Sequence, residues 1–159
     1  MTSAPGENDV RLRMMLGAAL KAPEWPGGFS MRTLQASDAP ALHALWQTAF
    51  DDFDQPLDEW WRWLSGDEEF DPALCFLVFD RDGRLAGAAQ CWTSAFIKDL
   101  AVHPDFRGRG IAEALLRQVF SAFRARGAAH VDLKTNLVDS AAAVRLYRKL
   151  GMVEVGWAG

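Results

Sequence analysis

The residues from Arg107 to Ala112 have the composition of a phosphate-binding turn. The run Arg-Gly-Arg-Gly-Ile-Ala follows an apolar segment that ends at Val102 and precedes a stretch whose apolar residues recur at helical spacing. Glycines let the backbone approach a ligand closely, and the free N–H groups of a first helical turn point at it with the positive end of the helix dipole. The two arginines add positive charge. The run therefore predicts a site for a phosphate-bearing cofactor.

Two common phosphate-binding motifs do not fit this run. The dinucleotide motif G-x-G-x-x-G needs a third glycine, and only Gly108 and Gly110 are present. The mononucleotide P-loop needs a Gly-Lys pair, which the sequence lacks. The run does match [QR]-x-x-G-x-[GA] directly after a strand. In this it resembles the pyrophosphate loop of the GNAT superfamily, the acyl-CoA-dependent N-acyltransferases.

A second stretch supports the same resemblance. Residues 143–152, Ala-Val-Arg-Leu-Tyr-Arg-Lys-Leu-Gly-Met, are similar to the closing helix of that family, A-x-x-L-Y-x-k-L-G-[FM]. The two motifs occur in the family's order and at about its separation, and the resemblance covers roughly Met31 to Val155. It implies an N-acetyltransferase that uses acetyl-CoA as acyl donor and moves the acetyl group to a primary amine.

The elements that must position these motifs can be read from the apolar pattern. The pattern predicts a mixed α/β sheet with helices on both faces. In the resembled fold two parallel strands, here 95–102 and 129–135, separate and admit the pantetheine arm of the cofactor. Strands are expected over 29–34, 73–79, 84–93, 95–102, 129–135 and 153–157. Helices are expected from Ser37 or Asp38 to Ala49, over 57–64 and 110–126, and from Asp139 or Ser140 to Leu150.

The first 28 residues lie outside the resemblance. Residues 1–8 are small and polar, which predicts disorder. Residues 9–22 are expected to form a short helix with Leu12, Met15, Leu16 and Ala19 on one face, broken by the prolines and glycines that follow. We therefore expect an N-terminal extension over 1–28, to which the sequence assigns no function, and a single GNAT domain over 29–159.

Acyl transfer from a thioester to an amine needs few groups: one to take a proton from the amine, donors to hold the carbonyl, and an acid for the leaving thiolate. The resemblance implies that Tyr147 is the general acid; the alternative is a buried helix tyrosine. Asn136 and Ser140 are candidate cofactor contacts, or else turn and cap residues. The remaining cofactor contacts that the resemblance implies are Leu100, Ala101, Val102, Arg107, Gly108, Arg109, Gly110, Ile111 and Ala112.

The general base is less clearly marked. Family members place a carboxylate on the strand before the V-x-P turn or use a chain of waters, and Asp99 is the carboxylate on that strand. A surface aspartate beside Lys98 is the alternative. Glu68, Glu69 and His103 are further candidates, although a histidine in the V-x-P turn is more often a loop residue.

Charge is unevenly divided along the chain. Residues 1–97 hold 15 acidic and 7 basic residues, a net −8, whereas residues 98–159 hold 6 acidic and 10 basic residues, a net +4. Between Trp46 and Asp71 there are nine acidic residues against Arg62 alone, next to Trp60, Trp61 and Trp63. Carboxylates with aromatic rings suit an organic cation, so we expect a cationic amine acceptor. A solvated acidic face is the alternative.

Bulk properties exclude other classes. The 159 residues suffice for one domain, and the charge distribution lacks the broad basic patch of a nucleic-acid binder. Cys75 and Cys91 lie in apolar runs and are expected to be buried free thiols rather than a disulfide or a reactive thiol. No Cys/His cluster has metal-ligand spacing, and no apolar run approaches the length of a membrane span. A cytoplasmic protein without metal or membrane contact is expected.

Other interpretations stay open at this point. The chain could be a non-catalytic acyl-CoA-binding sensor or interaction module, or an enzyme that acetylates protein N-termini or lysines. Family members often end in a two-strand hairpin, and only eight residues follow Gly151 here. Either the sheet ends short, a partner chain completes it, or the sequence is truncated. Because an unpaired edge strand invites pairing, a homodimer is a further possibility.

Overall fold

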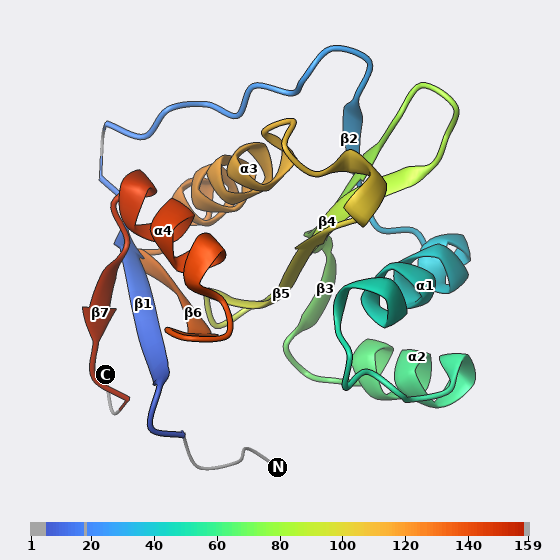
Figure 1. The fold of residues 1–159 in the computed structure, drawn as a ribbon, viewed down its shortest axis with the longest axis horizontal. Coiled ribbons are helices and arrows are strands. Elements are labelled where there is room, and N and C mark those ends of the chain that lie inside the picture. Colours follow the sequence, from blue (N-terminus) through green and yellow to red (C-terminus); the bar gives the residue numbers. More distant parts are fainter. Residues whose placement is uncertain (1–5, 18, 158–159) are drawn as a thin grey trace.

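The computed structural model describes residues 6–17 and 19–157. Within these residues, seven strands form one mixed sheet in the order β2-β3-β4-β5-β6-β1-β7 (Figure 1). The strands are β1 (Asp9–Met15), β2 (Ser30–Thr33), β3 (Phe70–Phe79), β4 (Leu85–Trp92), β5 (Phe96–Val102), β6 (His130–Asn136) and β7 (Val153–Val155). The helices are α1 (Ala39–Ala49), α2 (Leu57–Ser65), α3 (Ile111–Ala125) and α4 (Ala141–Leu150). The expected fold class is confirmed.

Helices cover both faces of the sheet. α1 and α2 pack on one face, where their apolar residues meet Cys75, Leu77 and Ala88 of β3 and β4. α3 and α4 pack on the other face, and the buried side chains of α3 recur at helical spacing from Ile111 to Phe123. The sheet thus separates two apolar cores, one under α1 and α2 and one under α3 and α4 (Figure 1). Cys75 and Cys91 are buried free thiols, as predicted.

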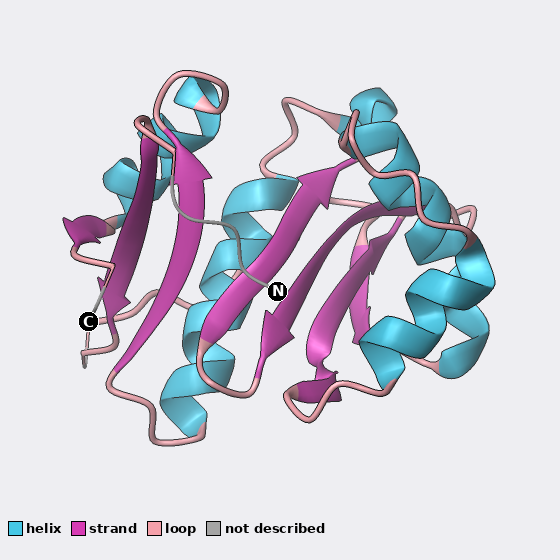
Figure 2. Cartoon of the chain, turned by 90° about the horizontal axis from the view of Figure 1, so that it is seen from below, coloured by secondary structure: helices cyan, strands magenta, loops and turns pink. Residues whose placement is uncertain are grey.

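The parallel strands β5 and β6 separate soon after they meet, as expected. Only two residue pairs, Phe96 with Asp132 and Ile97 with Leu133, are in register between them. Figure 2 shows the two groups of strands diverging on either side of this point. Beyond Ile97, the side of β5 that faces β6 has no strand partner in the described residues. The backbone N–H and C=O groups on that side of β5 can therefore form hydrogen bonds with a ligand.

The prediction of a helix over residues 9–22 is wrong. Residues 9–15 form strand β1, which pairs antiparallel with β6 over seven residues and with β7 on its other side. The physical reason is an alternation of period two: Val10, Leu12 and Met14 face the α3/α4 core, whereas Arg11 and Arg13 lie on the opposite face. Residues 9–15 therefore belong to the same sheet as the rest of the chain. Residues 1–5, part of the segment expected to be disordered, lie outside the described residues.

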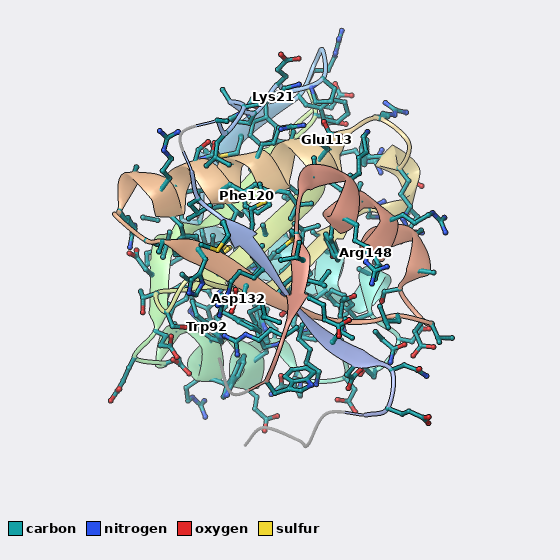
Figure 3. All side chains as sticks on the ribbon, turned by 90° about the vertical axis from the view of Figure 1, so that its left-hand side faces the viewer. Lys21, Trp92, Glu113, Phe120, Asp132 and Arg148 are labelled. Carbon is teal, nitrogen blue, oxygen red and sulfur yellow. The ribbon has the colours of Figure 1, made fainter. Side chains whose placement is uncertain are left out.

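The place of β1 bears on how the sheet is completed. None of the three expected outcomes anticipated that an N-terminal strand would lie between β6 and the last strand, β7. An ion cluster helps to hold it there. Asp132 on β6 accepts hydrogen bonds from Arg11 Nε at 2.7 Å and from Arg13 Nε at 2.8 Å, on the sheet face that α3 and α4 do not cover (Figure 3). β1 is thereby fixed to β6, one wall of the strand separation.

Smaller boundaries also differ from expectation. β3 begins at Phe70 rather than at residue 73, and β7 ends at Val155 rather than Trp157. The hairpin between β3 and β4 turns at Gly83, whose φ of 82° is the left-handed value that a tight turn requires. No helix in the described ranges is long and apolar enough to cross a membrane.

Candidate functional site

A pocket of about 390 Å³ lies between the end of β5, the start of α3 and the side of α4. We call it the loop pocket. It brings together eight of the predicted cofactor contacts and the predicted general acid, although they come from two distant motifs. Its predicted members are Leu100, Ala101, Val102, Arg107, Gly108, Gly110, Ile111, Ala112 and Tyr147. The two sequence motifs thus meet at one place in the fold.

The turn before α3 has the geometry of an anion site. Gly108 and Gly110 have φ values of 78° and 84°, which non-glycine residues rarely adopt, and a methyl group added to either would meet no atom within 4 Å. Gly110 is the residue immediately before α3, so the free N–H groups of the first turn open into this space. The site fits a pyrophosphate held through backbone, with Arg107 beside it.

The end of β5 offers further donors to the same pocket. The N–H of His103 donates to the carbonyl of Ala86 on β4, at 2.8 Å. Because successive N–H groups along a strand point to opposite sides, the N–H groups of Val102 and Leu100 point away from β4, into the gap that β6 leaves. Two donors in a row suit the amides of a pantetheine arm and the oxygen of a thioester.

Tyr147 lies at the inner end of the loop pocket. Only 9% of its surface is exposed, and it belongs to the core between α4 and the sheet. Burial raises the pKa of its hydroxyl, so that the group keeps its proton at neutral pH. A protonated hydroxyl in a pocket can donate a proton to a leaving group.

Asp99 reaches the opposite face of the sheet because of a β-bulge. Gln90 pairs with Asp99 but Cys91 pairs with Ile97, which leaves Lys98 as the extra residue on β5. Ile97 and Leu100 both contribute to the α3/α4 core, three positions apart, so the alternation is reset between them. Asp99 consequently shares a face with Ala101, under α1 and α2.

The surroundings of Asp99 favour its protonated form. The carboxyl lies deep among protein atoms, while 28% of the side chain stays open to a pocket. Burial raises the pKa of Asp99, Lys98 at 3.3 Å lowers it, and the charge of Asp52 raises it again, with a net result above the usual value. A carboxylate with a raised pKa is better able to take a proton from an ammonium group.

A second pocket, of about 360 Å³, opens on the α1/α2 side, and we call it the aromatic pocket. Asp52 and Asp99 contribute the carboxylates, and Lys98 and Gln55 the other polar side chains. Of the tryptophans predicted near the acidic stretch, Trp60 is buried and Trp63 is 47% exposed. The aromatic rings that line this pocket are Phe50, Phe53, Trp60 and Trp63. Aromatic faces beside two carboxylates form a suitable environment for a cationic amine.

A third pocket, of about 230 Å³, joins the other two through the strand separation, and we call it the junction pocket. It shares Phe50, Lys98 and Asp99 with the aromatic pocket. It shares Leu100, Ala143 and Tyr147 with the loop pocket. Because neighbouring pockets share these residues, we treat the three pockets as one passage through the sheet, with Asp99 toward one end and Tyr147 toward the other. An amine and a thioester that enter from opposite faces can meet inside it.

Some predicted residues lie elsewhere. Arg109 lines a separate pocket with Lys21 and Trp25, on the other side of the α3 N-terminus. Asn136 uses both ends of its amide locally: Nδ2 donates to Asp9, and Oδ1 accepts from the backbone N–H groups of Val138 and Asp139. Ser140 does line the junction pocket.

The other base candidates are occupied with local structure. His103 Nδ1 accepts from the N–H of Asp105 at 3.1 Å, which makes it the cap of a short turn. Glu69 accepts from the N–H of Ser94 at 3.1 Å, and Glu68 lines none of the three pockets. Among the carboxylates considered on the sequence, Asp99 is the one on the passage.

Sequence reasoning missed several residues of the aromatic pocket. Phe50, Phe53 and Gln55 were not singled out, and Asp52 was one of nine acids without distinction. The contacts that place this loop are not visible in the sequence. His43 Nε2 contacts the Gln55 carbonyl oxygen at 2.7 Å, and the His43 ring packs against Phe53 and Trp60. The buried histidine thus fixes the loop between α1 and α2 over the pocket.

Comparison with known proteins agrees with the resemblance found in the sequence. A sequence model of the acetyltransferase (GNAT) family matches residues 34–152. A mycothiol acetyltransferase of Clavibacter michiganensis subsp. michiganensis is 35% identical over 138 residues, which are 78% of this chain and 42% of that protein. A streptothricin acetyltransferase of Streptomyces lavendulae is 37% identical over 86 residues, 51% of this chain and 45% of that protein.

Among solved structures, a GCN5-related N-acetyltransferase from Sphaerobacter thermophilus superimposes with a TM-score of 0.82 at 30% identity. The match covers 92% of this chain and 48% of that one. The chain therefore spans about half the length of the relatives named here.

Proposed function

Because the chain belongs to the GNAT acetyltransferase family, we propose that it transfers an acetyl group from acetyl-CoA to the primary amine of a small cationic molecule. Asp99 acts as general base and Tyr147 as general acid. The single observation that carries the proposal is the passage through the sheet, since the two residues line its junction pocket from the two sides.

The chain's residues fit the acyl donor at three points. The turn around Gly108 and Gly110 holds the pyrophosphate through backbone N–H groups at the start of α3. The N–H groups of Leu100 and Val102 hold the pantetheine arm and polarise the acyl oxygen. When bound, acetyl-CoA supplies the acyl group as a thioester.

The reaction then needs two proton movements. Asp99 takes a proton from the acceptor ammonium, and the freed nitrogen lone pair forms the new C–N bond while the C–S bond breaks. Tyr147 donates its hydroxyl proton to the departing sulfur, and its raised pKa keeps that proton in place until then. Holding both reactants in one passage supplies much of the remaining rate gain.

The acceptor's charge is selected on the α1/α2 side. Asp52 and Asp99 place two carboxylates among four aromatic rings. The other acids of the predicted acidic stretch do not line this pocket, and two of them are engaged elsewhere: Asp71 pairs with Arg126 at 2.8 Å, and Asp67 accepts from the N–H of Glu69. The charge preference therefore resides in two residues rather than in the whole stretch.

A matched pair of amines tests the proposal. With acetyl-CoA, 1,4-diaminobutane presents two equivalent amines and 4-amino-1-butanol presents one on a chain of the same length. The values of kcat/KM are therefore compared per reacting amine, and the second charge is the remaining difference. We expect release of the CoA thiol with both, and a higher kcat/KM for the diamine that declines as salt rises. Equal kcat/KM for the two would contradict the cationic acceptor. Absence of turnover with any amine, in a protein that binds acetyl-CoA by calorimetry, would point to a sensor module instead.

A further inference from the structure

Gln90 is a buried polar residue that the fold does not explain. It lies in the middle of β4, and 1% of its surface is exposed. Its Nε2 donates to the Cys91 carbonyl at 3.2 Å. Its Oε1 accepts no hydrogen bond from any residue of 6–17 or 19–157. A buried acceptor without a donor is destabilising, and such groups are rare in folded proteins, which suggests that Gln90 has a function other than packing.

The register of the sheet places Gln90 beside Asp99. The two residues lie directly opposite each other on the antiparallel strands β4 and β5. Opposite residues in such a pair have Cβ atoms about 4.5–5.5 Å apart, within reach of a glutamine amide. Both also share a face with Ala88 and Ala101, which belong to the core under α1 and α2. Gln90 thus lies behind Asp99, on the side away from the strand separation.

Other ionisable groups surround this pair on the same face or across the passage. Two are lysines, and the rest are carboxyl, imidazole, thiol and phenol groups. Lys98 contacts Asp99 from the bulge, and Lys134 lines the junction pocket from β6. The others are Asp52 in the loop after α1, Cys75 on β3, His43 on α1, Asp38 before α1 and Tyr147 on α4. None of them donates to Gln90 Oε1.

We propose that Gln90 is a positioning residue for the general base: its Oε1 accepts a hydrogen bond from the Asp99 carboxyl once that carboxyl has taken the proton of the acceptor amine. The proposal rests on the proposed function, in which Asp99 is the base. The donor that Gln90 lacks is therefore one that the reaction creates. Because Nε2 donates to the Cys91 carbonyl, Oε1 is the end of the amide that is left without a partner, and we assign it to the carboxyl.

Two consequences follow for the chemistry. A hydrogen bond to the protonated carboxyl favours that form, so Gln90 acts with burial in raising the proton affinity of Asp99. The proton arrives on the carboxyl oxygen that faces the pocket, and rotation about the Cβ–Cγ bond of Asp99 then turns this O–H to Gln90 Oε1 and the second oxygen to the pocket. Gln90 does not touch the substrate, since it lines none of the three pockets.

Gln90→Met tests the proposal, because methionine keeps the length of the side chain and removes the acceptor. The probe is the ¹³Cγ resonance of Asp99, assigned with Asp99→Asn and titrated in the protein with CoA bound. We expect the Asp99 midpoint to fall by roughly 0.5–1 pH unit, the size of one ordinary hydrogen bond to the neutral form. A midpoint that stays or rises overturns the proposal. A rise would mean that the amide nitrogen, not the oxygen, faces the carboxyl.

Thermal unfolding and a control variant separate positioning from simple packing. Gln90→Met should unfold at a temperature equal to or higher than the native protein, because it replaces an unpaired buried acceptor by an apolar group of similar shape. A clear loss of stability would overturn the proposal, since it would show that Oε1 already has a structural partner. Gln118→Met on α3, outside the three pockets, should change neither the titration nor the rate.

The base assignment itself is tested separately. If Asp99→Asn abolishes the acid limb of kcat/KM with an accepted amine, the base stands, and the Gln90→Met titration then decides the role of Gln90 alone. If Asp99→Asn keeps both the rate and the limb, the base assignment falls, whatever the titration of Gln90→Met gives. Gln90→Glu adds a check on proximity, since a second carboxylate opposite Asp99 should raise the midpoint. An unmoved midpoint there contradicts the placement of the pair.

Discussion

The two ends of the passage through the sheet differ in the groups that line them, which are mainly backbone at one end and side chains at the other. The loop pocket is made largely from backbone: two left-handed glycines, the first turn of α3 and the free edge of β5. The aromatic pocket is made from side chains, four rings and two carboxylates held over the sheet by α1, α2 and their loop. Backbone donors recognise what every acyl-CoA has in common, whereas side chains can change without disturbing the fold. Under the proposed function, cofactor recognition therefore belongs to the backbone and acceptor choice to a few side chains.

Tyr147→Phe should have the largest effect, because it removes the hydroxyl that the proposed function assigns as general acid. We expect kcat to fall by about 10²–10⁴-fold, the usual range for a general acid, while the Kd of acetyl-CoA stays within about twofold. Burial raises the pKa of Tyr147, so the native enzyme should not lose this proton, or the rate that depends on it, below about pH 10. Steady-state kinetics and calorimetry measure the two quantities. A kcat within tenfold of native would assign the acid role to another group.

Gly110→Glu should affect the loop pocket alone. The substitution forces a non-glycine residue to a φ of 84° and puts a negative charge where the helix dipole attracts a pyrophosphate. We expect the affinity for acetyl-CoA to fall by about a hundredfold, measured by calorimetry on the folded protein.

Gly127→Glu is the matched control for this variant. Gly127 follows the other end of α3 and has a φ of 85°, with no atom within 4 Å of an added methyl group. The backbone strain and the added charge are therefore the same. Because the helix dipole disfavours a carboxylate at the C-terminus of α3 and favours one at the N-terminus, Gly127→Glu should lose at least as much stability as Gly110→Glu. It should nevertheless bind acetyl-CoA normally. If both variants lose binding equally, the α3 N-terminus is not the phosphate site.

Asp132→Ala should destabilise the pairing of β1 with β6, the strand that forms one wall of the passage. Burial raises the pKa of Asp132, but hydrogen bonds from Arg13 and Arg11 outweigh it and leave the pKa below the usual value. The free energy of unfolding should fall by about 2 kcal/mol, because Arg11 and Arg13 lose the carboxylate that pairs with both of them between β1 and β6. Asp105→Ala, which breaks the exposed pair with Arg84, should have a much smaller effect, because water screens an exposed ion pair.

The same cluster predicts a pH dependence of stability. A carboxyl whose pKa is lowered on folding contributes its full stability above its unfolded pKa, and loses it as the pH falls through the folded pKa. The gap in unfolding free energy between the native protein and Asp132→Ala should therefore be largest above about pH 4 and close below it. Denaturant titrations at pH 7 and pH 3 measure this. A constant gap would show that the loss comes from packing alone.

The same contrast explains what the sequence could predict. The loop, α3 and α4 were recognisable because glycine spacing and a helical apolar period determine them locally. β1 was misassigned although Val10, Leu12 and Met14 alternate with Arg11 and Arg13, because Leu12, Met15 and Ala19 also satisfy a helical period. What decides between the two is the distant partner β6, whose Asp132 pairs with both arginines.

The acceptor side shows the same limit more strongly. Asp99 was found from its place before the V-x-P turn, but its facing direction depends on a bulge at Lys98 that no local pattern encodes. Asp52 could not be told from its eight acidic neighbours, since pocket membership depends on a loop held by His43. Backbone-made sites leave a sequence motif; sites made from converging side chains do not.

Asp52→Asn is the finest test of this contrast. It removes one carboxylate from the aromatic pocket and leaves the base, the acid and the α3 turn in place. For 1,4-diaminobutane we expect KM to rise about three- to tenfold, in line with one partly exposed charge pair, with little change for 4-amino-1-butanol and none in the Kd of acetyl-CoA. Since the charge of Asp52 raises the pKa of Asp99, the acid limb of kcat/KM should also move to lower pH.

Asp54→Asn, two residues along the same loop but outside the pocket, serves as the matched control and should change neither the KM for 1,4-diaminobutane nor the acid limb. Equal effects of the two substitutions would mean that the acceptor senses a diffuse acidic face, and acceptor choice would then reside in the net charge of the region rather than in particular side chains.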